Sequence, residues 1–165
     1  MENKYSHSQE TINFDHNSKL QSISRILFPE IIVICEKYLT PHIIAKIKQQ
    51  IQQALWYRCY SYNILQEHYN NEPELTDECI EDNYNLQQIH INSMLNNVSD
   101  DKIQEAWHVV RLTDSANIHY IIIFKDSSFL CKCTWLVSHG IVCQHYFAVL
   151  LESNIAIFHI LFIIQ

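Results

Sequence analysis

The sequence is poor in glycine and in basic residues, and each shortage excludes a class of function. Its 165 residues contain one glycine, whereas average usage would give roughly a dozen. Glycine-rich phosphate loops need several glycines, so nucleotide sites of the Walker and Rossmann types are excluded. Eleven Lys and Arg against 18 Asp and Glu give a formal net charge of −7. This balance argues against a surface that is basic throughout and binds nucleic acid by charge.

We also expect neither a secretory leader nor a membrane-spanning run. The polar N-terminus lacks the apolar stretch of a signal peptide, so we expect a soluble, intracellular protein. The apolar residues 155–165 fall short of the about 20 that a membrane helix needs. We expect them to form a buried helix or strand, or the end of a truncated gene, and expect no membrane anchor. Six cysteines are too few for a disulfide-stapled secreted scaffold, and in a reducing compartment clustered cysteines favour metal binding.

What is present is enough apolar sequence for a core. Hydrophobic residues make up 48% and charged residues 18%, which excludes wholesale disorder. The patterns along the chain predict the α+β class. We expect five parts: a flexible leader at 1–20, a helical segment at 21–61, an acidic linker at 62–104, a β-meander with a cysteine-rich module at 105–152, and an apolar tail at 153–165.

The helical segment has its clearest signal after Thr40. Thr40-Pro41 is typical of a helix start, with threonine as the N-cap and proline at the first helical position. Apolar residues then recur at helical spacing as far as Leu55. We expect helices from about Arg25 to Tyr60, with an interruption at Pro29.

Charge is distributed unevenly over the helical segment and the linker. The helix carries three cations and no acidic residue, which leaves open either a basic face or an ordinary solvated side: Lys46, Lys48 and Arg58. Residues 62–106 contain ten acidic side chains and one lysine, so they contribute −9 and the rest of the chain +2. We expect this stretch to be a linker with one short helix around residues 76–82 and little core.

After residue 104 the pattern changes to the alternation of β-strands, and it becomes helical again beyond Gly140. β-branched and aromatic residues separated by turn-forming residues predict a three-stranded antiparallel meander. The expected strands are 105–113, 118–124 and 129–133, joined by turns at 114–117 and 125–128.

Four residues of metal-ligand type follow within fifteen positions, with the spacing C-x-C-x9-C-x-H: Cys131, Cys133, Cys143 and His145. Three thiolates and one imidazole are an ordinary closed set for structural zinc. Alternate residues of a strand face the same way, so Cys131 and Cys133 can bind one ion. Cys143 must be extended before a helix that holds His145 in its first turn. The spacing predicts one structural Zn²⁺.

Alternatives stay open within the motif. Free cysteines are often simply buried, but two closely spaced ligand pairs favour zinc. His139 competes as fourth ligand and ranks below His145 because it lies in the loop. Gly140 falls where a positive φ would help the chain to reverse. The other cysteines are scattered and are expected to be core or surface thiols: Cys35, Cys59 and Cys79.

Residues 131–150 resemble a SWIM-type zinc finger, whose pattern is C-x-C, a variable gap and C-x-H. Trp135 matches the aromatic residue that members carry after the second cysteine, whereas Val142 stands where members carry proline. The preceding strands and residues 39–56 resemble the C-terminal region of Mutator-like element transposases and far-red-response-type proteins. The resemblance implies a transposase-derived fragment that binds nucleic acid, and a nuclear location.

The transposases' RNase-H-like catalytic domain does not fit beside these segments, so we expect no enzyme. Residues 125–152 carry two lysines, one aspartate and one glutamate, so we expect weak, strongly salt-dependent DNA binding. A protein–protein interaction module and a decayed transposon fragment without activity are the alternatives. The oligomeric state stays open. We expect metal chelation to unfold residues 129–151 while the upstream helices persist.

Overall fold

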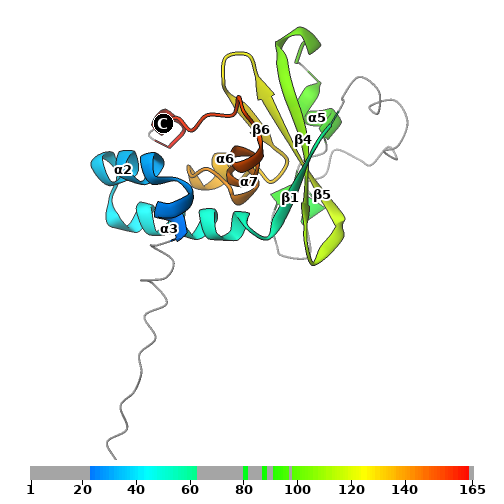
Figure 1. Ribbon diagram of the computed structural model, residues 1–165. Helices are drawn as coiled ribbons and strands as arrows, with labels where there is room; N and C mark the ends of the chain where they lie inside the picture. The colour runs from blue at the N-terminus through cyan, green and yellow to red at the C-terminus, as the bar shows by residue number, and fades with distance from the viewer. Residues whose placement is uncertain (1–22, 63–79, 82–86, 89–90, 97, 164–165) are drawn as a thin grey trace, which may run out of the picture.

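Helices and strands are mixed in one body, as the α+β prediction requires. The computed structural model describes these residues: 23–62, 80–81, 87–88, 91–96 and 98–163. Helices α2 (Pro29–Tyr38) and α3 (Pro41–Ala54) lie on one side and an antiparallel sheet on the other. Between them, α7 (Gln144–Glu152) contacts α3 and three strands of the sheet (Figure 1). The predicted leader lies outside the described residues.

The helical layer forms where helical spacing predicted it. Residues 23–27 are helical, and both α2 and α3 begin with proline at the first position, where its missing N–H costs no hydrogen bond. The residues that α3 buries recur at helical spacing: Ile44, Ile47, Gln50, Ile51 and Ala54. Four of these are apolar, as predicted, and the fifth, Gln50, is a polar side chain that the apolar pattern did not include.

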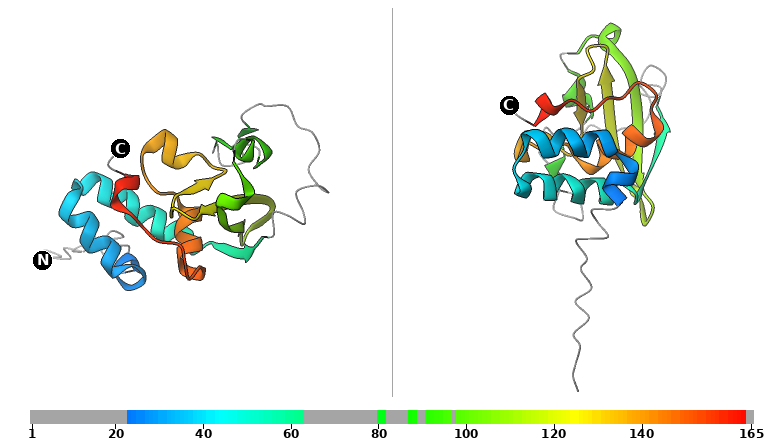
Figure 2. Two further views of the ribbon diagram at one scale, coloured as in Figure 1. Left: turned by 90° about the horizontal axis from the view of Figure 1, so that it is seen from above. Right: turned by 60° about the vertical axis from the view of Figure 1, so that its left-hand side comes forward.

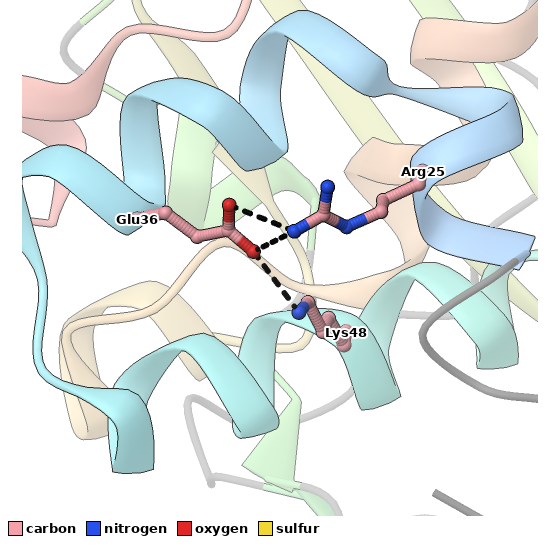
Figure 3. A network of polar contacts seen from close by, with 3 residues as sticks. All are labelled: Arg25, Glu36 and Lys48. Carbon is pink, nitrogen blue, oxygen red and sulfur yellow. Dashed lines mark hydrogen bonds and ion pairs between the residues drawn. The ribbon is translucent and has the colours of Figure 1, made fainter. Parts of the chain in front are cut away.

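An exposed ion-pair network joins the helical elements to one another. Arg25 donates to both carboxylate oxygens of Glu36 at 2.7 and 3.0 Å, and Lys48 reaches the same carboxylate at 3.4 Å (Figure 3). Exposed pairs of this kind contribute about 0–1 kcal/mol. These ion pairs also change the charge that α3 presents. Lys48 is engaged with Glu36 and does not join Lys46 in a basic face.

The main sheet has four strands among the described residues, in the order β1-β4-β5-β6. The last three form the predicted meander: β4 (Ile103–Arg111), β5 (Asp114–Phe124) and β6 (Phe129–Cys131). All neighbouring pairs are antiparallel. The meander leads directly to the cysteine pair, since β6 ends at Cys131.

The first strand, β1 (Tyr57–Ser61), corrects the prediction that helix extends to about Tyr60 and that residues 21–61 are helical throughout. Helix α3 ends at Ala54, and Leu55 and Trp56 form a turn. β1 then pairs with β4, from Tyr57 opposite Arg111 to Ser61 opposite Trp107. Periodicity within a short window carries no information about such a distant partner, and this explains the error.

Pairing also overrides local turn signals. The turn predicted at 114–117 is wrong, because Asp114 begins β5 and pairs with Arg111. The chain reverses at Leu112 and Thr113 instead. The register of the β4–β5 pair shifts between Val110 and Arg111, next to this earlier turn. The pairing of the two strands, and not the local sequence, therefore sets where the chain reverses. The turn predicted at 125–128 is confirmed.

Part of the predicted acidic linker is structured. It holds a two-stranded sheet of β2 (Ile80–Glu81) and β3 (Gln87–Gln88), the helix α5 (Ile91–Leu95) and a 3₁₀ turn (Asp100–Lys102). The short helix predicted around 76–82 is contradicted at residues 80–81, which form a strand. The rest of that prediction lies outside the described residues.

One continuous core joins the layers. α7 supplies its centre, since Tyr146, Phe147 and Val149 have no exposed surface and pack with buried residues of α2, α3, β4 and β5. The apolar tail returns from α7 toward α2 and α3 (Figure 2). Its partly buried side chains pack on this core, but among the described tail residues, 153–163, the only regular element is a 3₁₀ turn (Ile160–Phe162). Over the described part of 155–165, the predicted buried helix or strand is therefore wrong. Residues 156–159 belong to no helix or strand and alternate between half-buried and exposed, so an irregular extended segment is enough to place one face on the core.

Candidate metal centre

The four side chains predicted as metal ligands converge on one point. Cys131, Cys133, Cys143 and His145 each offer a ligand atom, and these atoms lie within 4.8 Å of one another. The sulfur of Cys131 lies 3.4 Å from that of Cys133 and 3.7 Å from Nδ1 of His145. Cys131 is half-buried and the other three residues are buried. This Cys3His cluster could therefore hold a metal ion.

Cys131 and Cys133 meet through a turn. β6 ends at Cys131, and Cys133 lies in the turn that follows, before Thr134 at a φ of 49°. The backbone N–H of Trp135 hydrogen-bonds to the sulfur of Cys133. The prediction that both cysteines lie on one strand is thus wrong, although their sulfurs do meet. A β-branched residue at positive φ is strained, and such strain gathers at ligand sites.

The nine residues between the cysteine pairs contain a short helix and the only glycine. α6 (Trp135–His139) is capped at its C-terminal end by Gly140, which has a φ of 64°. A Cβ at this position would meet no atom within 4 Å, so the backbone conformation alone favours glycine. The predicted positive φ is confirmed. Ile141 and Val142 then bury their side chains and return the chain to the cluster.

The second ligand pair has the predicted local structure. Cys143 is the N-cap of α7 with extended backbone, φ −81° and ψ 161°, and His145 lies in the first turn of that helix. Two residues apart inside a helix, the two side chains would diverge. Because Cys143 is still extended, its sulfur and the imidazole of His145 reach the same cluster.

His139, the competing fourth ligand, lies outside the cluster. Its side chain is exposed and stacks on Trp135, with ring centroids 3.7 Å apart and planes 11° apart. Its Nδ1 lies 2.7 Å from the hydroxyl of Ser138. The metal-ligand atoms that the structure gathers include Nδ1 of His145 instead.

The three thiols differ in their acidity. Burial raises the pKa of Cys131 well above its usual value, and hydrogen bonds with Cys133 and Cys143 raise it further. Burial acts in the same direction on the pKa of Cys143, but hydrogen bonds from Cys131, Cys133 and His145 outweigh it and hold that pKa well below its usual value. Cys143 is therefore the first of the three to carry the negative charge that a cation requires.

Two side chains that the sequence did not single out tie the cluster to the rest of the fold. Gln50 of α3 is buried, and its Oε1 accepts a 2.9 Å hydrogen bond from the backbone N–H of Gln144. This bond satisfies one of the unpaired N–H groups at the start of α7. The side chain of Gln144 in turn donates to the hydroxyl of Tyr57 at 2.7 Å. The one signal in the sequence for this contact was Gln50 itself, a glutamine within the apolar stripe of a helix.

The imidazole of His145 packs against two rings. Tyr57 meets it edge-on at 4.8 Å between centroids, and His119 of β5 stacks on it at 3.8 Å. Among the described residues, Nε2 of His145 is buried without a hydrogen-bond partner, so ring packing orients it. Burial, reinforced by His145, lowers the pKa of His119 to about 2, so this neighbour is uncharged at neutral pH.

The remaining cysteines that the structure describes lie outside the cluster, as expected. Cys35 is buried in α2 and Cys59 is half-buried in β1. Burial raises the pKa of Cys35 to about 11 and that of Cys59 to about 12. Both are therefore protonated and poorly reactive at neutral pH. Cys79 lies outside the described residues.

Comparison of the chain with protein-family models, with curated proteins and with solved structures finds no match. The described helices also include none with the length and hydropathy to cross a bilayer. The geometry of the site is therefore the observation on which a functional proposal must stand.

Proposed function

We propose that the Cys3His cluster binds one structural Zn²⁺ ion. The observation that carries this proposal is the convergence of three sulfur atoms and one imidazole nitrogen within 4.8 Å. Tetrahedral zinc with Zn–S bonds near 2.3 Å holds sulfur atoms about 3.8 Å apart. The 3.4 Å between Cys131 and Cys133 and the 4.8 Å upper limit lie on either side of that value. Sulfur and nitrogen donors suit Zn²⁺, whereas Ca²⁺ and Mg²⁺ take oxygen ligands.

The role proposed for the ion is structural. Four protein ligands complete a tetrahedral zinc site and leave no position for water or substrate. The ion would join the end of β6 and the turn after it to the start of α7. Along the chain, these two segments are connected by the short helix α6. We propose no enzymatic activity for this centre.

We propose further that residues 131–150 form a SWIM-type module of a transposase-derived fragment with a nucleic-acid-binding role and a nuclear location. The ligand spacing supports the proposal, as does the position of Trp135 directly after the C-x-C turn. The observed order of strand end, turn, glycine and helix suits that pattern. Since residues 125–152 are electrically neutral, binding should be weak, and the part of it that comes from phosphate contacts should fall with salt.

Metal analysis of the purified full chain tests the zinc proposal. We expect one zinc per chain in the wild type and a large loss in Cys133→Ser, because serine replaces a thiolate with a poor zinc ligand. Cys59→Ser is the matched control, since it removes a half-buried thiol outside the cluster. Equal zinc in Cys133→Ser and Cys59→Ser would contradict the proposal.

The fourth ligand is tested by a second matched pair. His145→Ala should lose zinc, whereas His139→Ala should retain it, because His139 is exposed and lies outside the cluster. Zinc retained by His145→Ala and lost by His139→Ala would move the fourth ligand to α6.

A further inference from the structure

A cavity of about 590 Å³ lies beside the Cys3His cluster. It is lined by residues of α3, of the turn after it, of α6 and of the start of α7, and three members of the cluster form part of its wall. Its volume falls within the range of about 300–1,000 Å³ found for small-ligand sites. A metal at the cluster would thus border a space large enough for a ligand.

The charged residues of the lining suit an anion. Lys46 on α3 and Arg111 at the end of β4 both line the cavity, and no Asp or Glu among the described residues does. A zinc ion with three thiolates carries a net charge of about −1, which the two cations outweigh. A phosphate group is an anion that such a pair can bind.

Aromatic rings line the same cavity as these cations. Trp56, in the turn after α3, lines the cavity and is 53% exposed. Trp135 lines it too, stacked on His139. Flat aromatic faces next to positive charge are the usual platform for unpaired nucleobases, because every base offers a π-face for stacking.

One face of α3 adds amide groups to the same cavity. Lys46, Gln49, Gln50 and Gln53 lie at positions i, i+3, i+4 and i+7, and all four line it. Gln50 is engaged with the start of α7. Gln49 and Gln53 bring further amides, which can both donate and accept hydrogen bonds, as the edges of nucleobases do.

We propose that this cavity binds one unpaired nucleotide of a single-stranded nucleic acid. Its phosphate would lie at Lys46 and Arg111, and its base would stack on Trp56 or on the Trp135–His139 pair. The proposal rests on the nucleic-acid-binding role proposed above and narrows it to single strands. The bases of a duplex are already stacked and paired, so a duplex can place a base here only by unpairing it.

Fluorescence anisotropy of the zinc-loaded full chain tests the proposal. The probes are labelled oligothymidylate and oligouridylate of about twelve nucleotides and a hairpin duplex, at about 50 and 200 mM salt. The two single strands distinguish DNA from RNA as the source of the nucleotide. We expect single strands to bind about tenfold more tightly than the duplex, as stacking on an aromatic side chain allows.

Variants of the lining give the decisive comparison. Trp56→Ala should weaken single-strand binding about tenfold, and Trp56→Phe should restore most of it because the ring remains. Tyr38→Ala is the matched control, an aromatic residue on α2 that is 56% exposed and outside the lining. Lys46→Ala should reduce the salt dependence by about one counterion, whereas Lys125→Ala, in the turn before β6, should change it less.

The outcomes separate this proposal from the one on which it rests. One outcome is that the duplex binds as tightly as single strands and that Trp56→Ala and Tyr38→Ala have equal affinities for single strands. This outcome would overturn the proposed nucleotide site and leave the nucleic-acid-binding role standing. No binding to any probe at the lower salt would overturn both and favour a protein–protein interaction module. Zinc content and circular dichroism of each sample distinguish loss of the cavity from loss of the metal or of the fold.

Discussion

The helical layer of α2 and α3 and the metal region of β6, α6 and α7 reach the same core by different means. In the helical layer, the buried residues are almost all apolar and recur at helical spacing. The metal region also buries two polar side chains, Gln144 and His145, beside the thiols of Cys133 and Cys143. Buried polar groups destabilise a fold unless they are paired. The first region is therefore held mainly by apolar packing, whereas the second also depends on partners for its buried polar groups.

The continuity of the core changes what this difference implies. From the sequence, the metal region was expected to unfold by itself on chelation while the upstream helices persist. In the structure, α7 lies between α3 and the sheet, and its buried residues share one core with both. Neither region then presents a complete core without the other.

Removal of the metal should have the largest effect on the stability of the two regions. Structural zinc contributes a free energy comparable with the about 5–15 kcal/mol that stabilises a whole domain. We expect chelation to unfold both regions in one transition. Circular dichroism and hydrogen exchange would measure this transition. Protection that persists in α2 and α3 while residues 129–151 exchange freely would show that the two regions are independent.

A cavity in the shared core should have the next largest effect. Ile47 of α3 has no exposed surface, so Ile47→Ala should lower the free energy of unfolding by about 2–5 kcal/mol. Ile26→Ala is the control, since Ile26 is 75% exposed. If the core is continuous, Ile47→Ala should also weaken zinc binding in competition with a chelating dye. Unchanged zinc affinity in a destabilised variant would separate the two regions.

The hydrogen bond between the regions should have an intermediate effect. Gln50→Leu leaves the backbone N–H of Gln144 without its acceptor and should cost about 1–3 kcal/mol, the usual penalty for a buried unsatisfied group. Gln52→Leu, two residues along the same helix, controls for the change in side chain. Urea denaturation of the zinc-loaded proteins measures the difference in stability between the two variants. Equal midpoints would show that Gln50 does not position α7.

The smallest effect expected is at the glycine between the ligand pairs. Gly140→Ala places a side chain at a φ of 64° and should cost about 1 kcal/mol. Gly140→Asn should cost less, because asparagine tolerates this region better than alanine. Thermal denaturation of the three proteins would show the order Gly, Asn, Ala. An alanine variant as stable as the wild type would mean that the loop can adopt another path.

Part of the fold and of the candidate site could be predicted because its information is local. Helical spacing in α3, alternation in β4, the β-branched and aromatic residues of β5, and the C-x-C-x9-C-x-H spacing each depend on residues a few positions apart. The positive φ at Gly140 and the extended Cys143 before α7 followed from the same short-range constraints. For these features the chain's own geometry leaves few alternatives.

Other features depended on contacts between distant residues. β1 is a strand because β4 lies beside it, and the register of that sheet moved the turn to Leu112 and Thr113. The tail follows the surface of the core because that surface exists only once α7 has packed on α3. No local pattern contains these partners, so propensity alone assigned the wrong elements.

The sequence by itself determined which atoms can bind a metal and which segments carry them. Only the tertiary structure decided what surrounds them: Gln50 at the start of α7, Tyr57 and His119 against the ring of His145, and a cavity lined by Lys46 and Trp56. The physical reason is that ligand spacing is a constraint within one short segment, whereas burial, hydrogen-bond partners and cavities arise where segments far apart in sequence pack together.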